Sequence, residues 1–242
     1  MGNFVLVHGA WHGGWCWRDV AALLRAQGHT VFTPTMTGNG ERLHQSHHGV
    51  TLETHIRDVV GVIEAEELND VVLVGHSYGG MVITGVADRL PGRLAQLVYL
   101  DAFVPEHGDS LVSLIQQALP PEVAAHYTGA FYGGAVQGGH GGLIPPLSGA
   151  LFGALPATDA WMARRCNAHP LASFTAPLLL AGGSSTCPKL YILAEGWQPS
   201  PFHYFANKLA GQPGWRHARM PGGHGLMMDT PDALASLLLQ HL

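Results

Sequence analysis

The amino-acid sequence predicts an α/β fold, with a mostly parallel β-sheet flanked by helices. Two observations support this prediction. Short runs rich in β-branched and aromatic residues alternate with amphipathic stretches of helical length, which is the pattern of βαβ units. Hydrophobic residues make up 47% of the 242 residues and charged residues only 12%. A chain of this length and composition can bury one large core and is not disordered.

The alternation is clear at both ends of the chain. The expected strands cover residues 4–7, 31–32, 71–74, 97–100, 190–193 and 215–218. The expected helices cover residues 17–26, 52–68, 79–90 and 201–209, and a last helix starts at Pro231. Thr51 directly precedes the second helix, where a threonine side chain can accept a hydrogen bond from the first turn.

The middle of the chain breaks this rhythm. Residues 105–187 are rich in Gly, Pro and Ala, and their clearest helical pieces are 110–119 and 159–167. The pairs Gly133-Gly134, Gly138-Gly139 and Gly141-Gly142 predict mobile loops. Aromatic and branched residues recur through the segment, which favours ordered structure over a long disordered loop. We interpret it as a small helical cap inserted into a core formed by residues 1–104 and 188–242.

Composition and charge argue against several function classes. The formal net charge is −5, and no run of Lys and Arg offers a surface for nucleic acid. No apolar run reaches the ~18 residues of a membrane span, and the first residues do not resemble a signal peptide. The three cysteines fit a reduced, cytoplasmic setting. The sixteen histidines lack the spacing and carboxylate partners of a zinc enzyme, so we expect no metal.

Residues 75–79 contain the central motif. They read Gly-His-Ser-Tyr-Gly, directly after a buried strand and directly before a helix. Gly-x-Ser-x-Gly in this context is the nucleophile elbow of an α/β-hydrolase fold. The turn is so tight that Gly75 and Gly79 must lack side chains, and it lifts Ser77 above the sheet edge. The alternative is a chance Gly-Ser turn, but such a turn need not lie between a buried strand and a helix. We therefore predict that Ser77 is a nucleophile.

A serine hydroxyl needs a general base, which in this fold is a histidine on a late loop. His224 lies after the last expected strand and before the last helix, where that base belongs. His203 and His217 are the competitors, but one lies in an expected helix and the other in an expected strand. Chain order therefore favours His224.

Hydrolysis also requires two backbone N–H donors for the developing oxyanion. One should come from Tyr78, the residue after the nucleophile. The other should come from the loop after the first strand, where Ala10 is the expected donor. Gly9 allows the chain to bend at that point. We therefore expect Ala10 and Tyr78 to form the oxyanion hole.

The sequence offers two candidates for the acid that orients the histidine. The usual aspartate would follow the strand 190–193, but Trp197 stands where we expect it. Glu195, two residues earlier, is one alternative. Asp101, at the end of the strand beside the nucleophile strand, is the other, although an aspartate there can also simply cap a turn. We favour Asp101 over Glu195 as the partner of His224.

The sequence also predicts an apolar substrate pocket. Aromatic side chains near the site loops or in the expected cap could hold a flat aromatic group, although each could instead belong to the core of the cap. The expected pocket residues are Gly9, Trp11, Phe103, Phe131, Phe152 and Trp161.

The chain resembles a known family in three segments. Residues 4–17 look like the opening of the plant methylesterase and hydroxynitrile lyase family and its bacterial esterase relatives, residues 73–81 match that family's elbow, and residues 169–174 resemble its cap-to-core signature. The lyases of the family carry Thr where Gly9 stands and Lys where Gly225 stands, so the resemblance implies ester hydrolysis. The family's usual acid is missing at Trp197, so its triad cannot simply be carried over.

In length and opening sequence the chain is also similar to bacterial carbendazim-hydrolysing esterases. This resemblance implies cleavage of a methyl carbamate on a benzimidazole, which gives 2-aminobenzimidazole, methanol and carbon dioxide without a cofactor. The alternatives are a generic carboxylesterase for small aromatic esters, a ligand-binding protein similar to the plant hormone receptors of this fold, and a hydroxynitrile lyase. In every case the expected partner is a small molecule, not a nucleic acid or a membrane.

Overall fold

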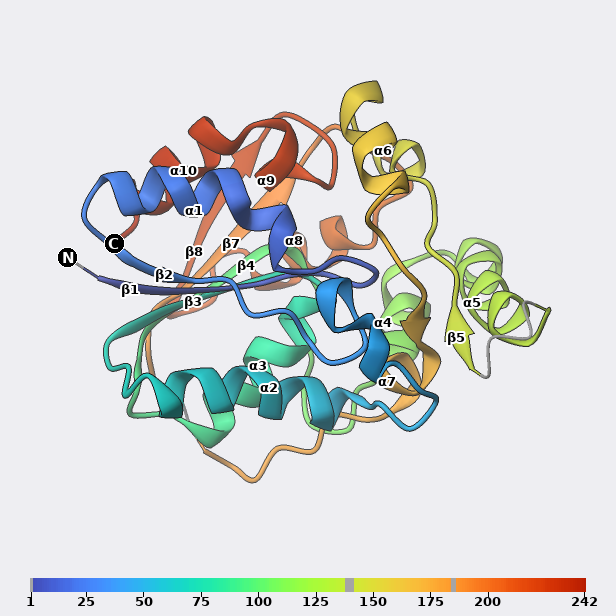
Figure 1. The fold of residues 1–242 in the computed structure, drawn as a ribbon, viewed down its shortest axis with the longest axis horizontal. Coiled ribbons are helices and arrows are strands. Elements are labelled where there is room, and N and C mark those ends of the chain that lie inside the picture. Colours follow the sequence, from blue (N-terminus) through green and yellow to red (C-terminus); the bar gives the residue numbers. More distant parts are fainter. Residues whose placement is uncertain (1, 138–141, 184–185) are drawn as a thin grey trace.

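A computed structural model describes residues 2–137, 142–183 and 186–242 (Figure 1). Its centre is a six-stranded sheet in the order β2-β1-β3-β4-β7-β8. The strands are β1 (Asn3–Val7), β2 (Thr30–Phe32), β3 (Val71–Ser77), β4 (Leu94–Ala102), β7 (Lys189–Ala194) and β8 (Trp215–Met220). Each neighbouring pair is parallel. The structure thus confirms the predicted fold class and all six expected strands.

Helices cover both faces of the sheet. In Figure 1, α1 (Arg18–Ala26) and α10 (Pro231–Gln240) lie above it, and α2 (Leu52–Ala65) and α3 (Gly79–Arg89) lie below it. The short α9 (Leu226–Asp229) precedes α10, and α8 (Phe202–Leu209) joins β7 to β8. Thr51 caps α2 as expected, in a reciprocal capping box with Thr54.

The core explains why the strands read as continuous apolar runs. A parallel sheet covered on both faces buries every side chain along its central strands. The side chains from Phe4 to Val7 are fully buried, and so are nearly all of those from Val71 to Val74. This arrangement places the carboxyl ends of β1, β3 and β4 next to one another, because neighbouring parallel strands end at the same edge.

Between β4 and β7 the chain forms several helices and two short strands beyond the carboxyl ends of the central strands, on the right in Figure 1. They are α4 (Leu111–Ala118), α5 (Pro121–Gln137), β5 (Leu143–Ile144), the 3-10 helix η3 (Gly149–Phe152), α6 (Pro156–Ala163), β6 (His169–Pro170) and α7 (Leu171–Thr175). β5 and β6 pair antiparallel in a small second sheet. Within the described ranges, no helix is long and apolar enough to span a membrane.

One loop expected in this segment is a helix. Gly133 and Gly134 lie inside α5. Pro121 suits the first turn of that helix, and packing of the buried Phe131 against Trp11 and Phe174 offsets the poor helix propensity of glycine. Of the other expected loop residues, Gly138, Gly139 and Gly141 lie outside the described residues. Gly142 lies outside the helices and strands, directly before β5, with φ of +84°.

Candidate active site

Ser77 ends β3 in a sharp turn, with φ of +55°. The surrounding backbone shows why glycines are needed on both sides of Ser77. A Cβ added at Gly75 would lie 2.6 Å from the carbonyl oxygen of Gly79, and one at Gly79 would lie 2.9 Å from that of Val7. At Gly80 the corresponding distance to the Phe103 oxygen is 2.0 Å. Only glycine fits these positions, so the chain can turn directly from β3 into α3 and leave Ser77 at the sheet edge.

His224 is paired with Asp101. Nδ1 of His224 lies 2.7 Å from Oδ2 of Asp101, whose side chain is fully buried at the end of β4. Oδ2 also accepts a hydrogen bond from Nε1 of Trp197 at 2.9 Å, and Oδ1 accepts one from the backbone N–H of Ala194 at 3.1 Å. A buried carboxylate needs such donors to replace water. The histidine and acid expected from the sequence therefore lie in direct contact.

The alternative acid points elsewhere. Glu195 pairs with Arg219 on the neighbouring strand at 2.9 Å, and its side chain is 44% exposed. The structure thus does not bring Glu195 to His224. Trp197, where a carboxylate was expected, instead donates to Asp101. Sequence reasoning missed this contact, although a buried indole N–H beside the end of β4 requires an acceptor.

Backbone contacts fix the loop that carries His224. Its N–H donates to the carbonyl oxygen of Phe152 at 2.8 Å, and its own carbonyl oxygen accepts from Nε2 of His76 at 2.9 Å. The imidazole stacks on the ring of Phe202, with centroids 5.0 Å apart and an interplanar angle of 10°. His76 directly precedes Ser77, so the nucleophile strand and the base loop are hydrogen-bonded to each other.

Buried neutral histidines hold the loop after β1, which contains the expected oxyanion donor Ala10. Nε2 of His8 accepts from the backbone N–H of Met36 at 3.0 Å, so its proton lies on Nδ1, which donates to the Gly9 oxygen at 2.7 Å. Nδ1 of His12 donates to the Ala10 oxygen at 2.6 Å. Burial lowers the pKa of His8 to about 3 and that of His12 to about 4. Because a peptide unit is planar, fixing the Gly9 oxygen also fixes the direction of the Ala10 N–H.

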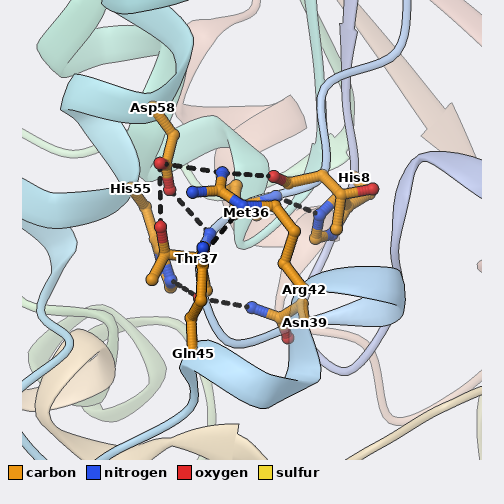
Figure 2. Close-up of polar contacts among 9 residues, drawn as sticks. His8, Met36, Thr37, Asn39, Arg42, Gln45, His55 and Asp58 are labelled. Carbon is orange, nitrogen blue, oxygen red and sulfur yellow. Dashed lines mark hydrogen bonds and ion pairs between the residues drawn. The ribbon is translucent and has the colours of Figure 1, made fainter.

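Figure 2 shows how the chain after β2 is held beside this loop. Asp58, on α2, accepts from the backbone N–H of Thr37 at 2.6 Å and from its hydroxyl at 2.8 Å. It also pairs with Arg42 at 2.9 Å, and Arg42 donates to the carbonyl oxygen of Thr35. These contacts tie residues 35–42 to α2 and present the Met36 N–H to His8.

Tyr78, the other expected oxyanion donor, is anchored through its side chain. Nε2 of His55 donates to the Thr37 oxygen at 3.0 Å, so its unprotonated Nδ1 accepts from the Tyr78 hydroxyl at 2.8 Å. Burial lowers the pKa of His55 to about 4 and raises the pKa of Tyr78 far above its ordinary value. The side chain that follows the nucleophile is therefore fixed to α2.

An apolar pocket opens beside these groups, with about 860 Å³ of empty space that includes solvent at its mouth. Ser77, His224, Ala10 and Tyr78 all line it. So do five of the expected pocket residues, namely Gly9, Trp11, Phe103, Phe131 and Phe152. Its lining also includes apolar residues that the sequence did not lead us to expect in the pocket: Leu111, Ile115, Leu119, Phe174, Trp197 and Phe202. The amphipathic pattern of α4, with Leu119 directly after it, was the signal available for the first three.

Trp161, the sixth expected pocket residue, lies elsewhere. Its ring packs edge-on against Trp15, with centroids 4.8 Å apart, and the guanidinium carbons of Arg18 and Arg165 lie 5.2 and 4.7 Å from it. A tryptophan face attracts cations, and this contact directs the side chain toward α1 instead of the pocket. Across the described ranges, no three His, Cys, Asp or Glu side chains are grouped to hold a metal ion.

Comparison with known proteins places this geometry in a family. A sequence model described as "Alpha/beta hydrolase family" matches residues 4–237. The "Carbendazim hydrolyzing esterase" of Nocardioides sp. (strain SG-4G) is 59% identical over 239 residues, which cover 98% of both chains. Salicylic acid-binding protein 2 of Nicotiana tabacum is 36% identical over 113 residues, which cover 46% of this chain and 44% of that protein.

Solved structures agree with these sequence matches. An extracellular alpha/beta-hydrolase from a Paenibacillus species, described as sharing structural and functional homology with the tobacco protein, superposes with a TM-score of 0.84 at 27% identity. The superposition covers 99% of this chain and 98% of the other. The Arabidopsis methylesterase MES16 superposes with a TM-score of 0.72 at 20% identity, covering 100% and 98%, which shows the shared fold. The chain therefore belongs to the alpha/beta hydrolase family and is a hydrolase of the esterase type.

Proposed function

We propose that this protein hydrolyses a small ester or methyl carbamate through an acyl-enzyme on Ser77, and that carbendazim is its substrate. The observation that carries the proposal is the 2.7 Å hydrogen bond between His224 and the buried Asp101, because His224 lines one apolar pocket together with Ser77. The identity of 59% with an esterase named for carbendazim supports the choice of substrate.

In this mechanism the Ser77 hydroxyl oxygen attacks the carbonyl carbon while Nε2 of His224 takes its proton, because Nδ1 is held by Asp101. The N–H groups of Ala10 and Tyr78 stabilise the oxyanion, and each such donor contributes about 3 kcal/mol in comparable sites. His224 then protonates the departing methoxide to give methanol. Water attacks the carbamoyl-enzyme with the same base, and the released carbamic acid loses carbon dioxide to give 2-aminobenzimidazole.

The pocket suits a flat, largely apolar group. Its walls include the rings of Trp11, Phe131 and Phe152, and aromatic rings stack favourably on such surfaces. Residues 105–187 supply two of these three rings, so we propose that this segment is a cap on a core formed by residues 1–104 and 188–242. Gly9 leaves space beside the nucleophile, since a Cβ there would lie 3.0 Å from the Cβ of Ser77.

The test follows 2-aminobenzimidazole and methanol formed from carbendazim by the purified protein. We expect equal amounts of both products from wild type and none from Ser77→Ala. Ser236→Ala, at an exposed position of α10, is the matched control and should retain wild-type turnover. Turnover by Ser77→Ala would overturn the serine mechanism. Hydrolysis of p-nitrophenyl acetate without hydrolysis of carbendazim would overturn the substrate and keep the mechanism.

A further inference from the structure

Trp197 contacts the catalytic acid of the proposed mechanism directly. Its Nε1 donates to Oδ2 of Asp101 at 2.9 Å, and the same oxygen lies 2.7 Å from Nδ1 of His224. The indole is almost fully buried, with 5% of the residue exposed. Two N–H donors from different parts of the chain therefore converge on one carboxylate oxygen.

These contacts leave the carboxylate little freedom to rotate. The backbone N–H of Ala194 holds Oδ1 at 3.1 Å, while Trp197 and His224 hold Oδ2. Ala194 ends β7 and Trp197 follows it by three residues. An acid carried by β4 is thus oriented by donors supplied from the adjacent strand and its loop.

The indole is itself held in place. Its ring packs edge-on against Phe152, with centroids 5.5 Å apart, and lies 5.9 Å from the ring of Phe202 and 5.2 Å from that of His224. A Cβ added at Gly153 would lie 3.1 Å from the Cβ of Trp197, which shows how closely the backbone after η3 approaches it. A donor fixed by packing can impose its direction on the group that accepts from it.

The hydrogen bond also has an electrostatic role. Burial deprives a carboxylate of water, and an N–H donor compensates for part of that loss. Without the indole N–H, Oδ2 would keep only the histidine as a donor, and the carboxylate could turn away from Nδ1. Orientation of the imidazole would then be less well defined at the moment when it must accept the Ser77 proton.

We propose that Trp197 is a positioning residue for the hydrolysis, and that its indole N–H acts through Asp101 to orient His224. The inference rests on the proposed function, in which Asp101 is the acid. It also gives Trp197 two separate roles, because one part of the indole lines the substrate pocket while the N–H contacts Asp101.

A double-mutant cycle on kcat separates these two roles. Trp197→Phe removes the N–H and keeps an aromatic ring in the pocket wall. We expect it to lower kcat for p-nitrophenyl acetate about tenfold, which is a typical effect of losing a hydrogen bond to a charged group. In an Asp101→Asn background the same change should lower kcat less than about twofold, since residues that act through one another are not additive.

Trp17→Phe is the matched control, because Trp17 is fully buried and its Nε1 has no hydrogen-bond partner within the described part of the chain. It should leave kcat within about twofold of wild type. Equal losses from Trp197→Phe in both backgrounds would show a role confined to packing or to the pocket wall, and would overturn the inference. Wild-type kcat in Asp101→Asn would overturn the proposed acid and the inference together.

A spectroscopic measurement keeps the proposal testable if Trp197→Phe does not fold. The indole N–H proton of Trp197 should be recognisable by nuclear Overhauser contact with the Nδ1 proton of His224, because both protons point at one oxygen. A charged acceptor moves such a proton downfield, so we expect the signal to shift upfield in Asp101→Asn. An unchanged chemical shift would contradict a hydrogen bond to a carboxylate.

Discussion

Ser77, the last residue of β3, and Asp101, the last but one of the neighbouring β4, share an unusual backbone conformation, with φ of +55° and +41°. The pairing of β3 with β4 shifts register between His76 and Ser77, so that Ser77 lies opposite Ala102. Positive φ is uncommon for residues other than glycine and costs about 1–3 kcal/mol at each position. The two proposed catalytic groups thus lie at strained positions near the carboxyl ends of adjacent strands, where the pairing of β3 with β4 is irregular.

The choice of acid gives the sharpest prediction. Asp101→Asn keeps the shape of the buried side chain but removes its charge, and we expect kcat to fall about 10⁴-fold, the loss that the same change causes in a serine protease triad. Glu195→Gln removes only an exposed ion pair with Arg219 and should leave kcat within about twofold of wild type. Steady-state kinetics with p-nitrophenyl acetate measures kcat of both variants. A large loss of kcat in Glu195→Gln and little loss in Asp101→Asn would assign the acid to Glu195.

Gly9 should be needed for activity. A Cβ at this position would lie 2.9 Å from Nδ1 of His76 and 3.0 Å from the Cβ of Ser77, closer than normal contacts. We expect Gly9→Ala to lower kcat at least about tenfold, because small displacements of a nucleophile are costly. Kinetics beside a thermal melt would check this.

Gly61→Ala is the matched control for that change. Gly61 lies within α2, and nothing lies within 4 Å of an added Cβ. Alanine should retain full activity and stabilise the helix by about 1 kcal/mol, which raises Tm by about 2–4 °C. If Gly9→Ala were as active as Gly61→Ala, the space beside Ser77 would have no role in turnover.

The pocket wall can be mapped with two aromatic substitutions. Phe131 lines the pocket and is buried, so Phe131→Ala should raise KM for an aromatic ester about tenfold through lost contact area. Trp161 packs between Arg18 and Arg165 outside the pocket, and Trp161→Ala should leave KM unchanged. A raised KM in Trp161→Ala would place that side chain against the substrate after all.

Stability should fall steeply on the acid side of neutrality. Burial lowers the pKa of His8 to about 3 and the pKa values of His12 and His55 to about 4, while the unfolded chain binds these protons near pH 6.5. The unfolded state therefore binds more protons between about pH 6.5 and 4, and each group removes about 1.4 kcal/mol of unfolding free energy per pH unit within that window.

Urea unfolding at pH 7.5, 6.5 and 5.5 measures this loss. We expect a midpoint that changes little from pH 7.5 to 6.5 and drops sharply below it. His12→Gln removes one of these histidines, so the unfolding free energy should depend on pH less steeply, by the contribution of one proton. A midpoint independent of pH between 6.5 and 5.5 would mean that these histidines are not held neutral by burial.

Much of the fold was predictable because local patterns and tertiary structure agree. The strands of the central sheet are buried on both faces and read as apolar runs, and Thr51 caps α2 where its side chain predicted a helix start. The nucleophile elbow was also predictable from a short segment, because Gly75 and Gly79 have no room for a side chain. The contact of His224 with Asp101 agrees with the expectation, although the two residues are 123 positions apart.

The remaining features depend on contacts that a single sequence does not contain. The sequence did not predict the part of α5 around Gly133 and Gly134, because glycine has poor helix propensity. This helix is stabilised by packing of Phe131 against Trp11 and Phe174. Trp161 carries the same aromatic signal as the true pocket residues, and only its arginine neighbours decide its direction. The hydrogen bond from Trp197 to Asp101 joins the loop after β7 to β4. The sequence shows only that a carboxylate is missing at position 197.

Covalent labelling tests the central claim most directly. The protein is treated with diethyl p-nitrophenyl phosphate, which transfers a diethylphosphoryl group to an activated serine, and peptide mass spectrometry locates the label. The serine mechanism predicts one label per chain, on Ser77, with esterase activity lost in proportion, and no label in Ser77→Ala. A label on another residue that abolishes activity, or full activity with Ser77 labelled, would contradict it.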